Sequence, residues 1–248
     1  MGGNIEKKKI LSDNNKHTIA IMQPTYLPWI GYFDLIEQAD TFVFLDNVDF
    51  TKQSWQQRNR IKTANGVQWL TVPILWRGRS GQKILDVVIN QAYKYKEKHI
   101  KTITQSYCKA PFFNLYVEEF SNIFVEHYQM LCKLNIDLIV WLCKKLGIDT
   151  TFIRSSELEI NGEKVERLIN ICRAFDADCY LSPPGSKEYI EENNLFISNN
   201  IELMYHNFQH PHYSQLHGDF VPYLSVIDLI FNEGPNSLDI IRNGIIQQ

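Results

Sequence analysis

The sequence predicts an α/β protein with a mostly parallel, Rossmann-like sheet. Short apolar runs rich in β-branched residues alternate with longer segments in which apolar residues recur at helical spacing. The runs lack the alternation of polar and apolar side chains that marks a half-exposed strand, so we expect helices on both faces of the sheet. Strands that alternate with helices along the chain are typical of parallel sheets.

The first crossover unit of this sheet is predicted directly after a polar N-terminal leader. An apolar run at 18–22 ends at a loop with two prolines, and a helical pattern at 29–39 and a second apolar run at 41–45 follow. Strand, loop, helix and strand within about 30 residues form the smallest parallel crossover. The runs that we expect to be buried inner strands are 19–22, 42–45 and 179–181.

The middle of the chain predicts a helical insertion at about residues 93–147. Helical patterns cover 94–105, 113–127 and 129–146, and Gly147 is a typical stop for the last helix. The stretch that precedes the insertion is less regular. It consists of a polar, basic segment at 47–65 and two β-like runs at 68–73 and 84–89.

The C-terminal part of the chain returns to the alternation of strands and helices. The predicted strands are 151–154, 179–181 and 201–205. The predicted helices are 163–175, a short one from the loop 182–186 to about residue 192, and 222–231. We expect residues 1–17 to be a flexible leader and residues 18–248 to form a single domain.

Composition and charge narrow the classes of function. The chain has 25 basic and 28 acidic residues and a net charge of −3, so no excess of positive charge favours duplex nucleic acid as a partner. No apolar stretch is long enough for a membrane span, and the leader lacks the apolar core of a signal peptide. Five scattered cysteines indicate buried thiols in a reducing compartment. We expect a cytoplasmic protein, and its oligomeric state is open.

Candidate functional residues follow the ends of the first two predicted strands, where open α/β sheets bind their ligands. Gln23, Tyr26 and Trp29 precede a helix N-terminus, which suits a phosphate or a carboxylate. Asp46 ends the second strand and leads into the basic segment. The candidate ligand contacts in that segment are Arg58, Asn59, Arg60 and Lys62. A solvated basic hairpin arm has the same composition, so both interpretations stay open.

Two later loops carry further candidates. Gly185 and Ser186 precede a predicted short helix and suit an anion, although the spacing is not that of a Walker motif. The segment 206–212 holds three histidines in seven residues. Their spacing matches no standard zinc pattern, so we expect one functional histidine, His210 or His212, and no metal site. The other candidates here are Tyr213, Ser225 and Asp228.

Several motifs together resemble the WbqC-like family. They are IMQPTYLPWIGYF at 21–33, FVFLD at 42–46, QRNRIK at 57–62 and WLTVP at 69–73, continued by shorter matches at 155–156, 180–182, 210–213 and 224–229. The resemblance covers roughly residues 18–234. Met22 departs from the family pattern, because relatives often carry histidine before the Gln-Pro pair. Members tend to be encoded with enzymes of bacterial surface-polysaccharide and sugar-nucleotide assembly, and a glycine- or acyl-transferring role towards sugars has been suggested for them.

The resemblance implies an enzyme that transfers an amino-acyl group, such as glycyl, or an acyl group to an amino sugar, carried as its sugar nucleotide, with formation of an amide. His210 or His212 is the expected base for the amine proton. Asp46 or Asp228 would orient that histidine, and the basic side chains of 58–62 would hold the diphosphate of the sugar carrier. The donor is open between a small amino acid or acyl group activated by ATP and an acyl-coenzyme A thioester.

Two alternatives stand beside this hypothesis. A non-catalytic sugar- or nucleotide-binding protein is supported by the aromatic content of 12%, because aromatic faces stack on sugars and bases. An ATP-dependent ligase or nucleotidylyltransferase-like enzyme is supported by the layout of strand, proline-bearing loop and glycine-containing helix start. However, WIGY at 29–32 lacks both histidines of the HxGH motif that binds ATP phosphates in those enzymes.

Overall fold

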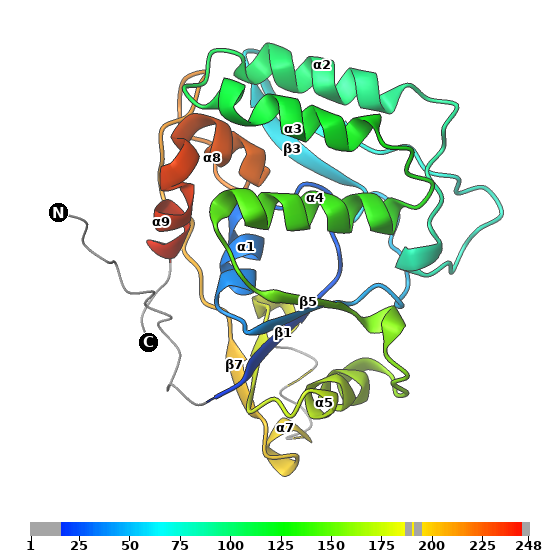
Figure 1. The fold of residues 1–248 in the computed structure, drawn as a ribbon. Helices are drawn as coiled ribbons and strands as arrows, with labels where there is room; N and C mark the ends of the chain where they lie inside the picture. The colour runs from blue at the N-terminus through cyan, green and yellow to red at the C-terminus, as the bar shows by residue number, and fades with distance from the viewer. Residues whose placement is uncertain (1–15, 187–189, 191–194, 245–248) are drawn as a thin grey trace.

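Five parallel strands form the central sheet in the order β5-β2-β1-β6-β7 (Figure 1). The computed structural model describes residues 16–186, 190 and 195–244. The strands are β1 Thr18–Met22, β2 Thr41–Phe44, β5 Thr151–Arg154, β6 Cys179–Ser182 and β7 Glu202–Tyr205. β2, β1 and β6 are the three inner strands, which confirms the prediction made from their apolar runs.

The chain reverses its direction across the sheet between β1 and β6. It adds β2 and then β5 on one side of β1, and afterwards β6 and β7 on the other side. A parallel sheet wound in this way leaves a crevice at the carboxyl ends of its strands, next to the reversal point. The loop that follows β1 lies next to this reversal point and is therefore the expected place for a ligand.

Alternate side chains of the inner strands enter two separate apolar cores. Ala20 and Phe42 belong to the larger core, and Ile19 and Val43 belong to the smaller one. Both faces of these strands are thus covered, which explains why their sequences show no polar alternation. In Figure 1 the helices α1 (Ile30–Glu37), α4 (Leu131–Leu146) and α8 (Val226–Glu233) lie on one side of the sheet, and α5 (Lys164–Ala174) and α7 (Leu195–Ser198) lie on the other.

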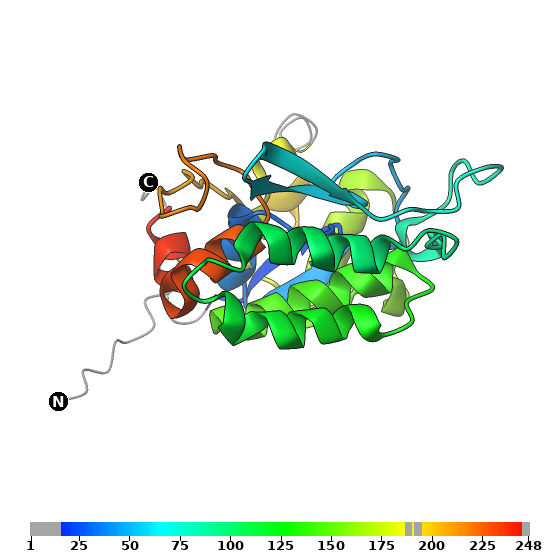
Figure 2. The ribbon, with the colours of Figure 1, turned by 90° about the horizontal axis from the view of Figure 1, so that it is seen from above.

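Three helices occupy the expected insertion: α2 (Tyr95–Tyr107), α3 (Phe113–Val125) and α4. Gly147 ends α4 in a left-handed conformation with φ 77°, as its position in the sequence predicts. An antiparallel hairpin of β3 (Arg58–Thr63) and β4 (Gly66–Thr71) lies alongside α2, as the view from above shows (Figure 2). Within the described ranges, no helix combines the length and the apolarity needed to span a bilayer.

Some predicted elements are wrong. The run 84–89 forms a 3₁₀ turn, η1 (Ile84–Asp86), followed by single bridges at Val88 and Ile89 instead of a strand. The helix expected from residue 222 begins at Val226, because Ser225 is its N-cap and its Oγ accepts from the Ile227 N–H group. The sequence prediction omitted β3 and the short helix α9 (Ser237–Arg242). The short helix expected up to about residue 192 falls largely outside the described residues, as does most of the leader.

Candidate functional site

A cavity of about 300 Å³ opens beyond the carboxyl end of β1, and we call it the β1 cavity. Its walls come from the loop after β1, the first turn of α1, the β3 region and the segment before α8. The lining residues are Met22, Thr25, Pro28, Trp29, Tyr32, Trp55, Asn59, Arg60 and Tyr223. Three of the residues predicted to bind substrate, Trp29, Asn59 and Arg60, are therefore brought together at the place where sheets of this kind bind ligands.

The loop 23–29 keeps its shape through hydrogen bonds to distant segments. The Asn59 side-chain amide donates to the Leu27 carbonyl at 2.7 Å, and the Val226 N–H group donates to the Pro28 carbonyl at 2.8 Å. Leu27 has a φ of 45°, a conformation that non-glycine residues rarely adopt. Because β3 and α8 hold this loop from two sides, the wall of the β1 cavity is formed by the fold itself.

Two arginines lie against aromatic rings near the cavity: Arg60 belongs to its lining, whereas Arg58 lies outside it. The Arg58 guanidinium lies 4.4 Å from the centroid of the Trp69 ring, and that of Arg60 lies 5.8 Å from the rings of both Trp55 and Trp69. Arg60 also donates to the Tyr223 carbonyl at 3.2 Å. The Nε atoms of both arginines are buried without a hydrogen-bond partner among the described residues. Cations held by aromatic faces keep their hydrogen bonds available for an anionic ligand.

His210 packs directly behind the cavity wall. Its ring is stacked on that of Trp29, with centroids 6.2 Å apart, and it also contacts the ring of Tyr223. Nδ1 lies 2.9 Å from the Pro211 carbonyl, whereas Nε2 is buried and has no partner among the described residues. Burial lowers the pKa of His210 below its ordinary value of 6.5. The neutral ring thus donates from Nδ1 and keeps a free lone pair on Nε2.

The second candidate base, His212, has a different environment. It is exposed, and its ring stacks on that of Phe220 with centroids 4.2 Å apart. Neither histidine lines the β1 cavity, and of the two, His210 contacts residues of its wall, Trp29 and Tyr223.

Asp228 and Lys62 are engaged inside the protein. Oδ1 of Asp228 accepts from the Tyr107 hydroxyl at 2.8 Å and Oδ2 accepts from the Tyr213 hydroxyl at 3.0 Å, and burial raises the pKa of this carboxyl group. The Lys62 ammonium, in a residue that is 3% exposed, donates to three oxygen atoms of the segment 215–219. Both groups therefore hold the fold around α8, and neither lines the β1 cavity.

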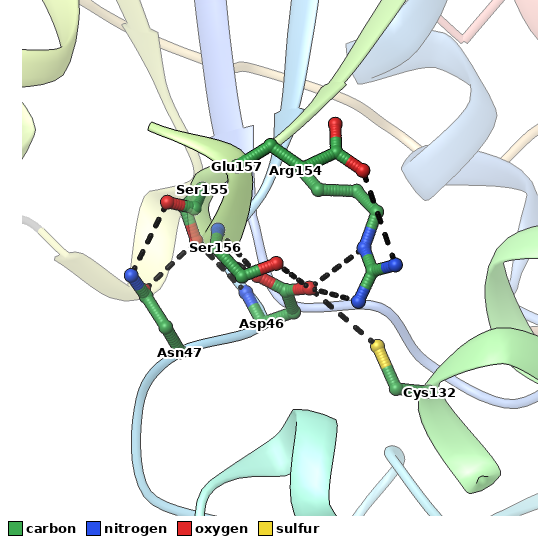
Figure 3. A network of polar contacts seen from close by, with 7 residues as sticks. All are labelled: Asp46, Asn47, Cys132, Arg154, Ser155, Ser156 and Glu157. Carbon is green, nitrogen blue, oxygen red and sulfur yellow. Dashed lines mark hydrogen bonds and ion pairs between the residues drawn. The ribbon is translucent and has the colours of Figure 1, made fainter. Parts of the chain in front are cut away.

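Asp46 lies at the centre of a polar network between the ends of β2 and β5 (Figure 3). Arg154 donates to its carboxylate from Nε at 2.9 Å, and Ser156 donates from its backbone nitrogen at 2.9 Å and its hydroxyl at 2.8 Å. The thiol of Cys132 and the hydroxyl of Ser155 complete the surroundings of this fully buried group. The network connects the end of β2 to η2 (Ser155–Glu157). Among the described residues no histidine takes part in it, so Asp46 does not orient the predicted base.

A comparison with models of known protein families identifies the family of this chain. The model of the WbqC-like protein family matches residues 23–240, which include every strand of the sheet after β1 and nearly the whole β1 cavity. The chain belongs to this family. It is also 36% identical over 226 residues to the uncharacterized protein Rv1507c of Mycobacterium tuberculosis, an alignment that covers 90% of this chain and 97% of that protein. No solved structure matches significantly. Membership in the family suggests a role in polysaccharide or sugar biosynthesis.

Four further predicted binding residues of this WbqC-like protein, Gln23, Tyr26, Gly185 and Ser186, do not line the β1 cavity. The Gln23 side chain accepts from Gln56 at 2.6 Å, and the buried Tyr26 hydroxyl bonds to Nδ1 of His99 at 2.8 Å. Ser186 is buried and its hydroxyl donates to the Pro183 carbonyl within the turn η3 (Pro184–Ser186). Gly185 of the same turn is exposed.

Sequence reasoning missed a buried hydrogen-bonded pair in this WbqC-like protein. Oδ2 of Asp34, on α1, lies 2.5 Å from Nε2 of His206, directly after β7, and both side chains are almost completely buried. Gln38 also donates to this oxygen, while Oδ1 has no partner among the described residues. The sequence did contain an indication of this pair. Asp34 lies among the apolar residues of a short helix, and a carboxylate buried there needs a partner.

The cysteines of the WbqC-like protein are poor nucleophiles where they are buried. Burial raises the pKa of Cys132 and Cys172 to about 12 and that of Cys179 to about 11, and it also raises the pKa of Cys143. A thiol with such a pKa is protonated at neutral pH and attacks slowly. Cys108 is exposed, so the expectation that all five cysteines are buried is wrong for this residue.

Proposed function

We propose that this WbqC-like protein is an enzyme that binds a nucleotide-linked amino sugar in the β1 cavity and transfers an acyl or amino-acyl group to its amine. One observation carries the proposal: an aromatic cavity lined by Arg60 adjoins a neutral histidine, His210, whose buried Nε2 has no partner in the described ranges of the chain. Aromatic walls alone would suit many apolar ligands, and the two polar groups make the site specific for an anionic ligand with a basic group.

The lining of the cavity matches the chemistry of a sugar nucleotide. The rings of Trp29, Trp55 and Tyr223 offer faces on which a sugar or a base can stack. Arg60, with Arg58 beside it, offers fork-shaped donors for the diphosphate. The volume lies at the lower end of the range of about 300–1,000 Å³ that small-molecule pockets cover. The cavity therefore suits the sugar and its nearest phosphate, with the nucleoside towards the exposed indoles.

His210 supplies the proton transfer in the proposed reaction. The amine nitrogen of the sugar attacks the carbonyl carbon of an activated donor, either a coenzyme A thioester or an acyl phosphate anhydride formed from ATP. A C–N bond forms, and the bond from the carbonyl carbon to the thiolate or phosphate breaks. The amine proton passes to Nε2 of His210 and then to the leaving group. Because His210 does not line the cavity and Nε2 is buried, this transfer requires the wall formed by Trp29 and Tyr223 to shift. The high pKa of the buried thiols argues against a cysteine-bound intermediate.

Binding and turnover together test the proposal. Thermal unfolding with UDP-, dTDP- and GDP-linked hexosamines should show stabilisation by at least one of them, because a ligand that binds the folded state raises the melting temperature. That sugar nucleotide, incubated with acetyl-coenzyme A or with glycine and ATP, should yield an amide detectable by mass spectrometry. The proposal fails if no sugar nucleotide stabilises the protein and no amide forms.

A non-catalytic binding protein is the second candidate, and the exposed indoles favour it. Trp55 is 49% exposed and Trp69 is 42% exposed, with ring centroids 5.4 Å apart. Such a surface is common in sugar-binding sites, since indole faces stack on sugar rings. Stabilisation by a sugar nucleotide without amide formation from either donor would favour this candidate.

A further inference from the structure

A second cavity, also of about 300 Å³, lies between β4 and the first turns of α2, and we call it the β4 cavity. Residues 68–71 and 73 form one wall. The other wall is formed by Tyr93, Lys94, Tyr95, Lys98, His99 and Thr102. None of these residues lines the β1 cavity. The two cavities are neighbours, because Trp69 of the second packs against Trp55 of the first.

The positive charge of the β4 cavity comes from two exposed lysines. Neither the Lys94 nor the Lys98 ammonium forms an ion pair with a carboxylate among the described residues, unlike Lys83, Lys133 and Lys145. His99 adds no charge, because burial lowers its pKa to about 4. A cavity with two unpaired cations and no carboxylate in its lining favours an anion.

Two aromatic rings of the lining are open to solvent. Tyr93 is 63% exposed and Trp69 is 42% exposed. Exposed apolar side chains that gather on one surface mark binding sites, whereas single scattered ones are ordinary. Their faces suit a planar ring.

Tyr95 provides an independent sign of a ligand. It lines the β4 cavity and is only 4% exposed, yet its hydroxyl has no hydrogen-bond partner among the described residues. The nearby Tyr26 hydroxyl, by contrast, is bonded to His99. Buried hydroxyl groups are nearly always bonded, and an unpartnered one is costly. A ligand oxygen in the cavity would accept the missing hydrogen bond.

We propose that the β4 cavity binds a phosphorylated nucleoside. Its ring lies against Trp69 and Tyr93, and its phosphates accept hydrogen bonds from Lys94, Lys98 and the Tyr95 hydroxyl. The inference goes beyond the proposed transfer reaction, because it concerns binding in a separate cavity. Its test does not depend on whether the transfer reaction takes place.

Calorimetric titration of the full chain with ADP tests the proposal. Adenosine, which lacks phosphate, and pyrophosphate, which lacks the ring, are titrated in parallel. We expect ADP to bind and each fragment to bind at least about tenfold more weakly, since ring and phosphates contribute separately. No binding of ADP overturns the proposal, and so does pyrophosphate that binds as tightly as ADP.

Variants assign the binding to the β4 cavity. Lys94→Ala/Lys98→Ala should weaken ADP binding by about tenfold to a hundredfold, the usual effect of losing charge-assisted contacts. Both lysines are exposed, so the variant should keep its melting temperature. Lys101→Ala, an exposed lysine on α2 outside the lining, is the matched control and should leave the affinity unchanged. If Arg60→Ala abolishes ADP binding and the lysine variant does not, ADP occupies the β1 cavity and the proposal is wrong.

Tyr95→Phe should change the affinity for ADP without a loss of stability, which a purely structural role of the hydroxyl would not produce. Removal of an unpartnered buried hydroxyl should keep or raise the melting temperature, because no hydrogen bond is lost. The same change should weaken ADP binding by about tenfold, since the phosphate loses a donor. Unchanged ADP affinity in Tyr95→Phe would show that this hydroxyl does not meet the ligand, and would contradict the proposal.

Discussion

The imidazole of His210 lies nearly parallel to the indole of Trp29, with the ring centroids 6.2 Å apart and an angle of 18° between the planes. Trp29 forms part of the wall of the β1 cavity, whereas His210 belongs to a loop almost two hundred residues later in the chain. The contact holds the imidazole behind the cavity, and Nε2 has no partner within the part of the chain that the structure describes. The proposed base is therefore held by an indole that lines the β1 cavity.

Replacement of His210 tests its role as the base. His210→Ala should lower the rate of amide formation by about 100-fold or more, the usual effect of losing a general base. The melting temperature should fall moderately, because the ring loses its packing against Trp29 and Tyr223, although its single hydrogen bond among the described residues is to the neighbouring Pro211. The rate is therefore measured at a temperature at which the variant is folded. His212→Ala is the matched control, since His212 is exposed, and it should keep its activity. Equal losses in both variants would contradict the assignment.

The pH dependence should carry the signature of this buried ring. Burial lowers the folded-state pKa of His210 below 6.5. The base form therefore persists as the pH falls to 6.5, and the rate should decline only at more acidic pH. The unfolded chain binds the proton at higher pH than the folded chain does, so stability should also fall as the pH drops below about 6.5. Urea unfolding at several pH values should show this loss in the wild type and a smaller one in His210→Ala.

The β1 cavity depends on Arg60 for its positive charge. Arg60→Ala should weaken the binding of the stabilising sugar nucleotide about tenfold or more, because a charge-assisted contact contributes about 1.5–3 kcal/mol. The fold should tolerate the change, since the guanidinium has a single hydrogen bond among the described residues, to the Tyr223 carbonyl, and its other contacts are with the exposed indoles of Trp55 and Trp69. Arg77→Ala removes an exposed arginine outside the cavity and is the control. Calorimetry on both variants decides the point, and equal affinity for Arg60→Ala and wild type would refute this role.

The sheet could be predicted from the sequence because each inner strand is apolar on both faces. The hairpin was predicted only as one of two interpretations of a basic segment, since β3 carries Arg58, Arg60 and Lys62 on one face and lacks the apolar run of an inner strand. A local signal existed in Asn65-Gly66, a dipeptide that favours tight hairpin turns, and Gly66 has a φ of 97°. The run 84–89 was misassigned because its apolar side chains fill the core from a 3₁₀ turn and single bridges.

The candidate site was predictable only in part. The end of β1 places Trp29 at the cavity, which follows from the topology of any parallel sheet. Trp55 and Tyr223 come from loops whose positions depend on long-range packing, and no local pattern indicates them. Asp46 and Lys62 are polar residues near strand ends, as ligand contacts would be, yet both are engaged by the protein itself. Residue type and spacing do not distinguish these two uses.

Asp46 should behave as a structural residue. Asp46→Asn should lower the free energy of unfolding by about 3 kcal/mol, the order of magnitude for removing one partner of a buried ion pair. Arg154 and the Ser156 N–H group would then face a neutral amide in place of the carboxylate. Asp49→Asn is the control, because Asp49 pairs with Lys83 at an exposed position and such pairs contribute at most about 1 kcal/mol. Urea unfolding compares the two variants. If Asp46→Asn is as stable as the control but inactive, Asp46 belongs to the chemistry after all.

Disruption of the buried pair of Asp34 and His206 should lower the free energy of unfolding more than the change at Asp46 does. The pair joins α1, which forms part of the cavity wall, to the end of β7. His206→Ala leaves the Asp34 carboxylate with Gln38 as its remaining described partner and should lower the free energy of unfolding by about 3–5 kcal/mol. Asp34→Asn introduced into that variant should restore part of the loss, since a neutral amide is less costly to bury than an unpaired carboxylate. A double-mutant cycle by urea unfolding measures the coupling between the two residues. Strictly additive losses would mean that the two side chains do not stabilise each other, and α1 would then be held by its apolar packing and its other polar contacts, such as the ion pair of Glu37 with Arg242.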